Sequence, residues 1–295
     1  MSLSAEQKQY YLDVLERTGS LKKSFAQRDI PAWYTDYKDK VTHEEVFLPT
    51  SHGDVRCVVS RANERENDCR AFIHIHGGGF FFPQNGDDDL FCARVAAETK
   101  GVVVDIDYAT SLEHPFPAAV EQCREVCRWI FENAESLGVS PERVSIGGDS
   151  AGGNLTAVMT QSGEFDFAMQ VLDYAALDMT KSGGDKNDPL TLSGERLEAF
   201  NVFYMDGNME LAKSPLVSPG RAEDDTLKKQ PATVMVTAGH CPFCGDNEAY
   251  ANLLVSLGIE VAMRRFTESR HGFTIRLVDE WDSAQKFIIS HLKRT

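Results

Sequence analysis

The sequence predicts an α/β fold in which a mostly parallel sheet is flanked by helices. From residue 41 onward, short runs rich in β-branched residues alternate with longer runs of helical periodicity. Glycine-rich segments follow directly after two of the strand-like runs, as in folds that bind ligands at strand ends. With 295 residues, 42% of them hydrophobic, the chain can bury a large core, and the single alternation favours one domain.

Eight strand-like runs are expected to form the sheet. They are Glu45–Leu48, Val55–Ser60, Ala71–Ile75, Val102–Ile106, Arg143–Ile146, Met169–Leu172, Thr233–Thr237 and Glu260–Phe266. Helices are expected between them at Asp89–Thr99, Ala118–Leu137, Ala151–Gln161, Asp246–Leu257 and Trp281–Leu292. In the second of these helices, Cys123 and Cys127 share an apolar face, which predicts that both pack in the core.

Two segments lie outside this alternation. Residues 1–40 read as a helix followed by a loop, and residues 181–229 are rich in Gly, Asp, Ser and Pro. An insertion of this kind sits above the carboxyl ends of the strands, so we expect residues 181–229 to form a lid or cap over a core of residues 41–180 and 230–295. A disordered excursion is the alternative, but Phe200, Phe203 and Tyr204 supply apolar mass that disordered segments lack.

Composition narrows the range of partners. The net charge of −15 and the pI near 5.0 argue against nucleic acid or an anionic membrane, and a neutral or cationic small molecule fits better. No apolar run is long enough to cross a bilayer and the N-terminus lacks a signal-peptide core, so a cytoplasmic protein is expected. Seven scattered cysteines predict reduced thiols rather than a disulfide framework.

The candidate nucleophile is Ser150, in the run Gly148 to Gly153. Gly-x-Ser-x-Gly between a strand and a helix forces the serine into a tight turn, where the flanking glycines avoid a steric clash. The helix that begins at Ala151 directs free N–H groups towards the site, where they can stabilise a developing oxyanion.

A second glycine-rich segment, His76 to Gly79, follows the strand that ends at Ile75. Its exposed N–H groups suit an oxyanion, so Gly78 and Gly79 join Ala151 as predicted donors. A phosphate loop would carry a Lys-Ser/Thr pair that is absent here. His76 is expected to hold this loop by hydrogen bonding.

His271 is the predicted general base, since it follows the last strand in a loop that can return to the nucleophile. Phe80, Phe81 and Phe82 follow the glycines and could line an acyl or alcohol pocket, with Phe80 and Phe81 as the predicted substrate contacts. Packing against the cap explains these residues equally well.

Together these motifs resemble the hormone-sensitive-lipase-like esterases of the α/β-hydrolase superfamily, also called bacterial family IV. The resemblance covers roughly residues 71–295 and includes further segments at Glu113–Ala119, Ser214–Pro219 and Glu248–Ala251. It implies an eight-stranded hydrolase sheet with a helical cap formed by residues 1–40 together with the insertion 181–229. It also implies hydrolysis of short-chain or acetyl esters by a serine carboxylesterase without a cofactor or metal. Members of that family often form dimers, so a homodimer is compatible with the resemblance.

The sequence departs from that family at the acid of the triad, because Cys241 stands where an aspartate is expected. A thiol is a poor replacement, since its thiolate is a minor species near neutral pH. Asp246 from the same loop is the provisional acid, and Glu248 is a weaker candidate. A slow Ser–His dyad, or a pocket that binds small molecules without turnover, are the alternatives.

Cys241 and Cys244 also form a Cys-x-x-Cys motif, which is typical of redox or metal sites. The hydrolase motifs elsewhere disfavour a dedicated oxidoreductase. A thiol switch acting on the loop that carries Asp246 remains a hypothesis. With His240 the two cysteines supply three of the four ligands that zinc requires.

Overall fold

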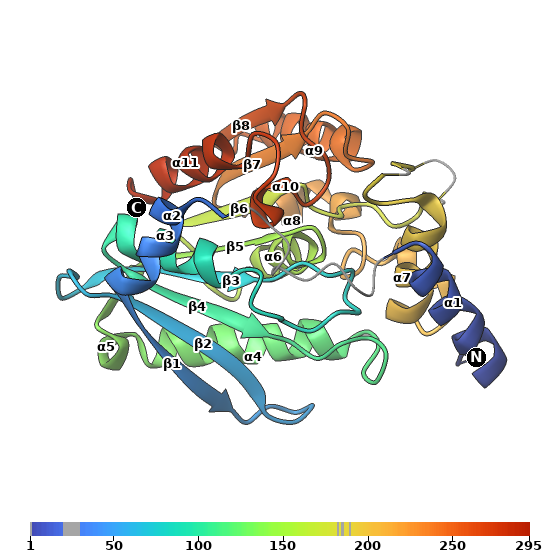
Figure 1. Cartoon of the computed structure of the whole chain (residues 1–295), viewed down its shortest axis with the longest axis horizontal. Coiled ribbons are helices and arrows are strands. Elements are labelled where there is room, and N and C mark those ends of the chain that lie inside the picture. The colour runs from blue at the N-terminus through green and yellow to red at the C-terminus, as the bar shows by residue number, and fades with distance from the viewer. Residues whose placement is uncertain (1, 20–29, 182, 184–185, 189) are drawn as a thin grey trace.

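The computed structural model describes residues 2–19, 30–181, 183, 186–188 and 190–295. Its centre is an eight-stranded sheet of order β1-β2-β4-β3-β5-β6-β7-β8 (Figure 1). The strands are β1 (Val41–Leu48), β2 (Val55–Ala62), β3 (Cys69–Ile75), β4 (Val102–Asp107), β5 (Val139–Asp149), β6 (Met169–Asp173), β7 (Ala232–Ala238) and β8 (Val261–Phe266). β2 is antiparallel to both of its neighbours, and β3 to β8 pair in parallel. The predicted α/β class and all eight strands are therefore confirmed.

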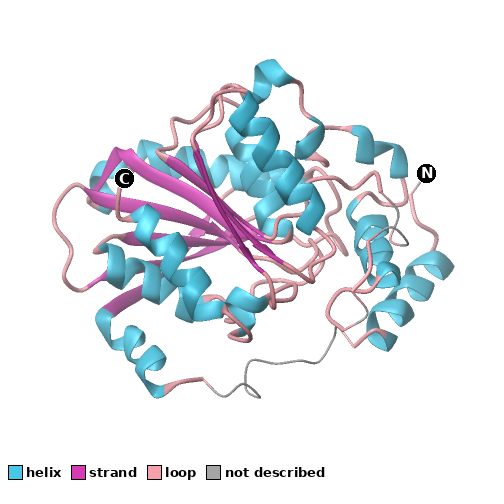
Figure 2. Ribbon diagram, turned by 90° about the horizontal axis from the view of Figure 1, so that it is seen from above, coloured by secondary structure: helices cyan, strands magenta, loops and turns pink. Residues whose placement is uncertain are grey.

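Helices cover both faces of the sheet (Figure 2). One face carries α3 (Asp89–Thr99) and α11 (Trp281–Leu292), which pack against each other. The other carries α4 (Ala118–Glu132), α6 (Ala151–Gln161) and α9 (Cys244–Ser256). The central strands β3 and β4 are covered on both sides and are almost entirely buried along their length.

The predicted helix Ala118–Leu137 is divided in the structure. α4 ends at Glu132, and a short helix α5 (Ala134–Leu137) follows. The interruption is at Asn133, whose side-chain Nδ2 donates to the carbonyl of Trp129 at 2.8 Å and so caps α4. Cys123 and Cys127 are fully buried, as predicted, and all seven cysteines are free thiols.

Helices α1 (Ala5–Arg17) and α7 (Gly194–Tyr204) pack against each other beyond the carboxyl ends of the parallel strands (Figure 1). The rings of Tyr11 and Phe203 meet edge to face, and Arg17 forms an ion pair with Glu195 at 3.0 Å. We propose that these two helices form the cap expected from segments 1–40 and 181–229.

Short helices complete the chain. They are α2 (Ala32–Thr35), α8 (Asp224–Leu227) and α10 (Phe273–Arg276), with 3₁₀ turns η2 (Asp36–Lys40), η3 (Met209–Lys213) and η4 (Pro219–Arg221). None of the described helices combines the length and apolar character that crossing a bilayer requires.

Candidate active site

Ser150 lies at the sharp turn between β5 and α6, in the backbone geometry that the motif predicts. Its φ of 53° is in the left-handed region, which is strained for a residue with a side chain. The turn is tight enough that a Cβ atom at Gly148 or Gly152 would overlap the carbonyl of Ile75. Glycine at these two positions therefore lets β3 and α6 approach closely enough to expose the serine hydroxyl.

His271 stands directly opposite the serine. Its Nε2 lies 2.9 Å from Ser150 Oγ, and the imidazole is packed between the rings of Tyr174 and Phe243. Burial, and then the charges of Arg276 and Arg196, lower the pKa of His271 well below its usual value. The imidazole is therefore neutral at pH 7 and able to accept a proton.

The second imidazole nitrogen faces Cys241, which corrects the provisional assignment of the acid. Nδ1 of His271 lies 3.1 Å from Cys241 Sγ, and the N–H of Phe243 donates to the same sulfur at 3.4 Å. When Nε2 accepts from the serine, Nδ1 carries the hydrogen. The sulfur then accepts from His271 Nδ1 and from the backbone N–H of Phe243. Burial raises the pKa of the Cys241 thiol, which keeps it uncharged.

Asp246 is engaged elsewhere. Its carboxylate forms ion pairs with Lys181 and, at 2.5 Å, with Lys186. It lies in the first turn of α9, where the helix N-terminus also favours a negative charge. Glu248 is likewise paired, with Arg265. Both candidate carboxylates thus pair with cations, and the group next to His271 Nδ1 is the sulfur of Cys241.

The glycine loop after β3 lies next to the serine. Gly78 and Gly79 both have positive φ, at 124° and 64°, which glycine adopts without strain. Within the described part of the chain, the N–H groups of Gly78, Gly79 and Ala151 donate to no other residue. The N–H of Gly77, by contrast, donates to Asp149 Oδ1 at 2.7 Å.

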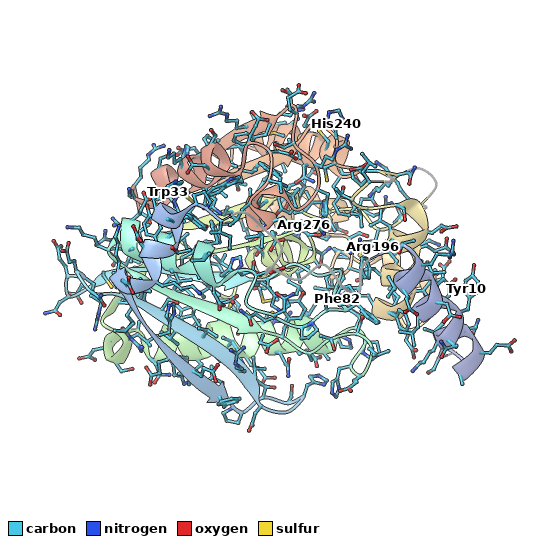
Figure 3. All side chains as sticks on the ribbon, in the orientation of Figure 1. Tyr10, Trp33, Phe82, Arg196, His240 and Arg276 are labelled. Carbon is cyan, nitrogen blue, oxygen red and sulfur yellow. The ribbon has the colours of Figure 1, made fainter. Side chains whose placement is uncertain are left out.

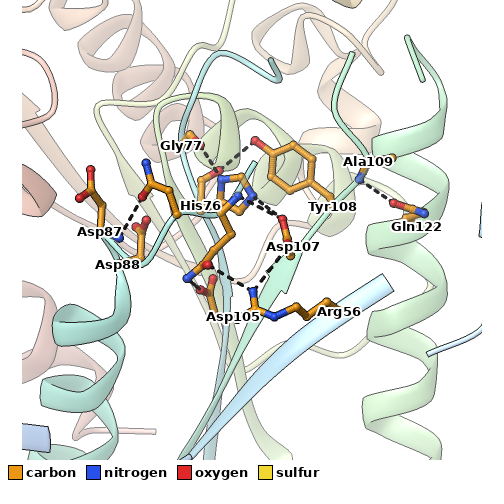
Figure 4. A network of polar contacts seen from close by, with 12 residues as sticks. Arg56, His76, Gly77, Asp87, Asp88, Asp105, Asp107, Tyr108, Ala109 and Gln122 are labelled. Atoms are coloured by element: carbon orange, nitrogen blue, oxygen red, sulfur yellow. Dashed lines mark hydrogen bonds and ion pairs between the residues drawn. The ribbon is translucent and has the colours of Figure 1, made fainter. Parts of the chain in front are cut away.

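His76 holds this loop, as the sequence predicts (Figure 4). Its Nδ1 is 2.6 Å from the carbonyl of Gly77, and its ring stacks on Tyr108 with centroids 4.3 Å apart. The Tyr108 hydroxyl in turn donates to the carbonyl of His76 at 3.1 Å. The backbone before the glycines is therefore fixed from both sides.

A cavity of about 610 Å³ opens onto Ser150 and His271. Phe80 and Phe82 line it, whereas Phe81 does not, which corrects the prediction for Phe81. All three rings contact α7: Phe80 stacks on Tyr204, Phe81 packs against Phe203 and Phe82 meets Phe200 edge to face. Contact with α7 therefore does not distinguish Phe81 from its neighbours.

Two overlapping groups of buried side chains beneath the loop could hold a metal ion. His74 lies with Cys92 and Asp105, and also with Asp88 and Asp149, with ligand atoms within 4.8 Å of one another. His74 Nε2 is already 3.0 Å from Asp88 Oδ1. Burial alone would lower the pKa of His74, but the hydrogen bond to Asp88 and the nearby carboxylates raise it to about 9. Burial raises the pKa of Asp105 and Asp149 to about 7. A protonated His74 therefore lies beside carboxyl groups that burial makes easier to protonate.

Comparisons with known proteins identify the family of the chain. Residues 72–275 match the model of a family described as alpha/beta hydrolase fold. Carboxylesterase NlhH of Mycobacterium tuberculosis is 31% identical over 212 residues, which are 68% of this chain and 65% of that protein. Esterase LipI of the same organism is 31% identical over 209 residues, 68% of this chain and 64% of LipI. The chain therefore aligns with just under two thirds of the length of these relatives.

Solved structures extend the similarity to the whole chain. A hyperthermophilic esterase from Pyrobaculum calidifontis superposes with a TM-score of 0.83 at 29% identity, covering 100% of this chain and 99% of that one. The carboxylesterase EstE1, from a metagenomic library, gives a TM-score of 0.82 at 28% identity, with 99% of each chain covered.

Proposed function

Since the chain belongs to the α/β-hydrolase fold family, within which it resembles the hormone-sensitive-lipase-like esterases, we propose that it hydrolyses carboxylic esters through an acyl-enzyme on Ser150. The observation that carries this proposal is the 2.9 Å contact between Ser150 Oγ and His271 Nε2 at the wall of the cavity. The esterase relatives and structural neighbours support the same reaction class.

In the first half of the reaction, Ser150 Oγ attacks the ester carbonyl carbon while its proton passes to His271 Nε2. The carbonyl oxygen becomes an oxyanion, which the N–H groups of Gly78, Gly79 and Ala151 stabilise. Cleavage of the carbon–oxygen bond to the alcohol then leaves the acyl group on Ser150. The departing alcohol takes the proton from His271.

In the second half, water attacks the acyl carbon and gives a proton to His271. The same oxyanion donors stabilise the new tetrahedral intermediate. Its collapse breaks the bond to Ser150 Oγ, which recovers the proton from His271, and the carboxylic acid is released. Residues of α7, together with Thr18 and Gly19 just after α1, line the cavity, and we propose that its substrates have short acyl chains or are acetyl esters.

Cys241 acts in this scheme as a positioning residue for the imidazole. A neutral sulfur that accepts from Nδ1 selects the tautomer that Ser150 needs, but it supplies no charge to stabilise the imidazolium. Loss of the carboxylate from a serine triad lowers kcat by as much as about 10⁴-fold, while binding and the oxyanion donors still give an acceleration of about 10³- to 10⁴-fold over water. We therefore infer slow turnover of simple esters.

The test combines active-site labelling with turnover. A fluorophosphonate probe should label the wild-type chain at one site per molecule, and Ser150→Ala should abolish the label. Wild type should hydrolyse p-nitrophenyl acetate above the Ser150→Ala background. Absence of both label and turnover in the folded wild-type protein would instead assign a pocket that binds small molecules without catalysis.

A further inference from the structure

Two guanidinium groups face the same cavity as the nucleophile. Arg196 comes from α7 and Arg276 from α10 (Figure 3). Both line the cavity together with Ser150 and His271. Their presence there contrasts with the whole chain, which carries a net charge of −15. The net charge of the whole chain therefore does not predict that two positive charges lie at this cavity.

Arg196 is held in place by its neighbours. Its guanidinium lies over the ring of Phe200, 5.5 Å from the centroid, and Nη1 donates to the carbonyl of Thr191 at 3.2 Å. Phe200 in turn packs so closely on Gly79 that a Cβ atom at Gly79 would overlap its ring. The side chain of Arg196 is thus anchored beside the oxyanion loop.

One donor of this guanidinium is buried and unused. Nε of Arg196 has no hydrogen-bond partner among the residues that the structure describes. Because a buried charge with an unpaired donor is costly, an acceptor that reached the guanidinium from the cavity would stabilise it.

Arg276 adds positive charge on the side of the base. Its guanidinium packs on the glycine that follows His271, where a Cβ atom at Gly272 would lie 3.2 Å from Cζ. Burial, and then Arg276, lower the pKa of Arg196 to about 10, so Arg196 still carries its charge at pH 7. Two cations therefore lie near an imidazole that must itself become positive during the reaction.

Three carboxyl groups, Asp87, Asp88 and Asp149, line another part of the cavity wall. Asp88 is hydrogen bonded to His74, and Asp149 accepts from the N–H of Gly77. These two acidic groups are therefore already committed to the network beneath the glycine loop.

We propose that the ester cleaved at this site carries a carboxylate, remote from the scissile bond, that binds Arg196 in the field of Arg276. This inference rests on the proposed esterase function and specifies its substrate class. The planar guanidinium fork suits a carboxylate. The bound carboxylate would also offset the two cations near His271, and so favour the imidazolium that Cys241 cannot stabilise.

The experiment compares two matched pairs of esters. One pair places the charge on the acyl side, as mono-(4-nitrophenyl) adipate and its methyl ester. The other places it on the alcohol side, as 4-acetoxybenzoate and its methyl ester. Wild type should show a kcat/KM about tenfold to a hundredfold higher for the anionic member of at least one pair, as expected for one charge-assisted hydrogen bond.

Variants link this preference to the guanidinium. Arg196→Gln should bring the anionic-to-neutral ratio close to one, and Arg196→Lys should retain part of the preference. Arg128→Gln is the matched control, because it removes the same charge from a surface residue that pairs with Glu164, and it should leave the ratio unchanged.

The outcomes separate the two proposals. Hydrolysis of the neutral esters with equal or lower kcat/KM for both anionic partners would overturn the substrate inference and leave the esterase function standing. A preference that persists in Arg196→Gln would overturn the role of Arg196. If none of the four esters is hydrolysed and the fluorophosphonate does not label Ser150, both proposals are wrong.

Discussion

Replacing Cys241 by aspartate should accelerate the enzyme, because it places a carboxylate where the thiol now meets the base. Sγ lies 3.1 Å from His271 Nδ1, and a carboxylate oxygen reaches one bond further from the backbone than sulfur does. The new oxygen can therefore form a charge-assisted hydrogen bond of about 2.8 Å. The N–H of Phe243, which now donates to the sulfur at 3.4 Å, supplies a second donor.

The size of the effect follows from the charges. A carboxylate and an imidazolium about 4 Å apart attract by about 4 kcal/mol at an effective dielectric constant of about 20. Each 1.36 kcal/mol or so corresponds to a factor of ten in rate, so the upper limit is about 10³-fold. Position 241 is only 5% exposed, and burial of the new carboxylate takes back part of this gain. We expect kcat to rise by about tenfold to about 10³-fold.

The assay is steady-state hydrolysis of p-nitrophenyl acetate at pH 7.5, with circular dichroism to confirm folding. Cys241→Ser serves as the control, since a hydroxyl has a similar size but no charge, and its kcat should stay within about tenfold of wild type. A folded Cys241→Asp protein with kcat no higher than that of Cys241→Ser would refute the assignment of position 241 as the partner of the imidazole.

Three further predictions address the base, the rejected acid and the nucleophile turn. The lowered pKa of His271 means that its neutral, active form persists to acidic pH, so kcat/KM of wild type should begin to fall only below pH 6.5. In Cys241→Asp the carboxylate favours the protonated imidazole, so the acidic limb of the pH–rate profile should move to higher pH. Coincident acidic limbs for the two proteins would contradict this. Asp246→Asn should keep kcat within about threefold of wild type, because its carboxylate contacts lysines and not His271, and a drop of orders of magnitude in the same assay would restore Asp246 as the acid. Gly152→Ala should lower the free energy of unfolding by about 1–3 kcal/mol, because its Cβ would overlap the carbonyl of Ile75 at the end of β3. Gly245→Ala is the control, since a Cβ atom at Gly245 meets no atom within 4 Å, and it should not lower this free energy. Equal midpoints of urea unfolding for the two variants would show that the turn is not tight.

Local sequence was sufficient to predict the sheet, the tight turn at Ser150 and the glycine loop after β3. The alternation of β-branched and helical runs reflects central strands buried on both faces, and that burial depends on the residues of each strand themselves. The backbone conformations at Ser150, Gly78 and Gly79 were predictable because only particular residue types adopt them readily, and the local motif names those types.

Only the tertiary structure decided which groups surround His271. Asp246 and Cys241 lie in one short segment, and the sequence left both available, but α9 begins at Cys244 and places the carboxylate against two lysines of the insertion. The approach of Arg196 and Arg276 to the base depends on how α7 and α10 meet across the cavity. Packing decides which residues far apart in the chain come into contact. The net charge of −15 sums over the whole chain, so it does not show that two arginines lie near His271.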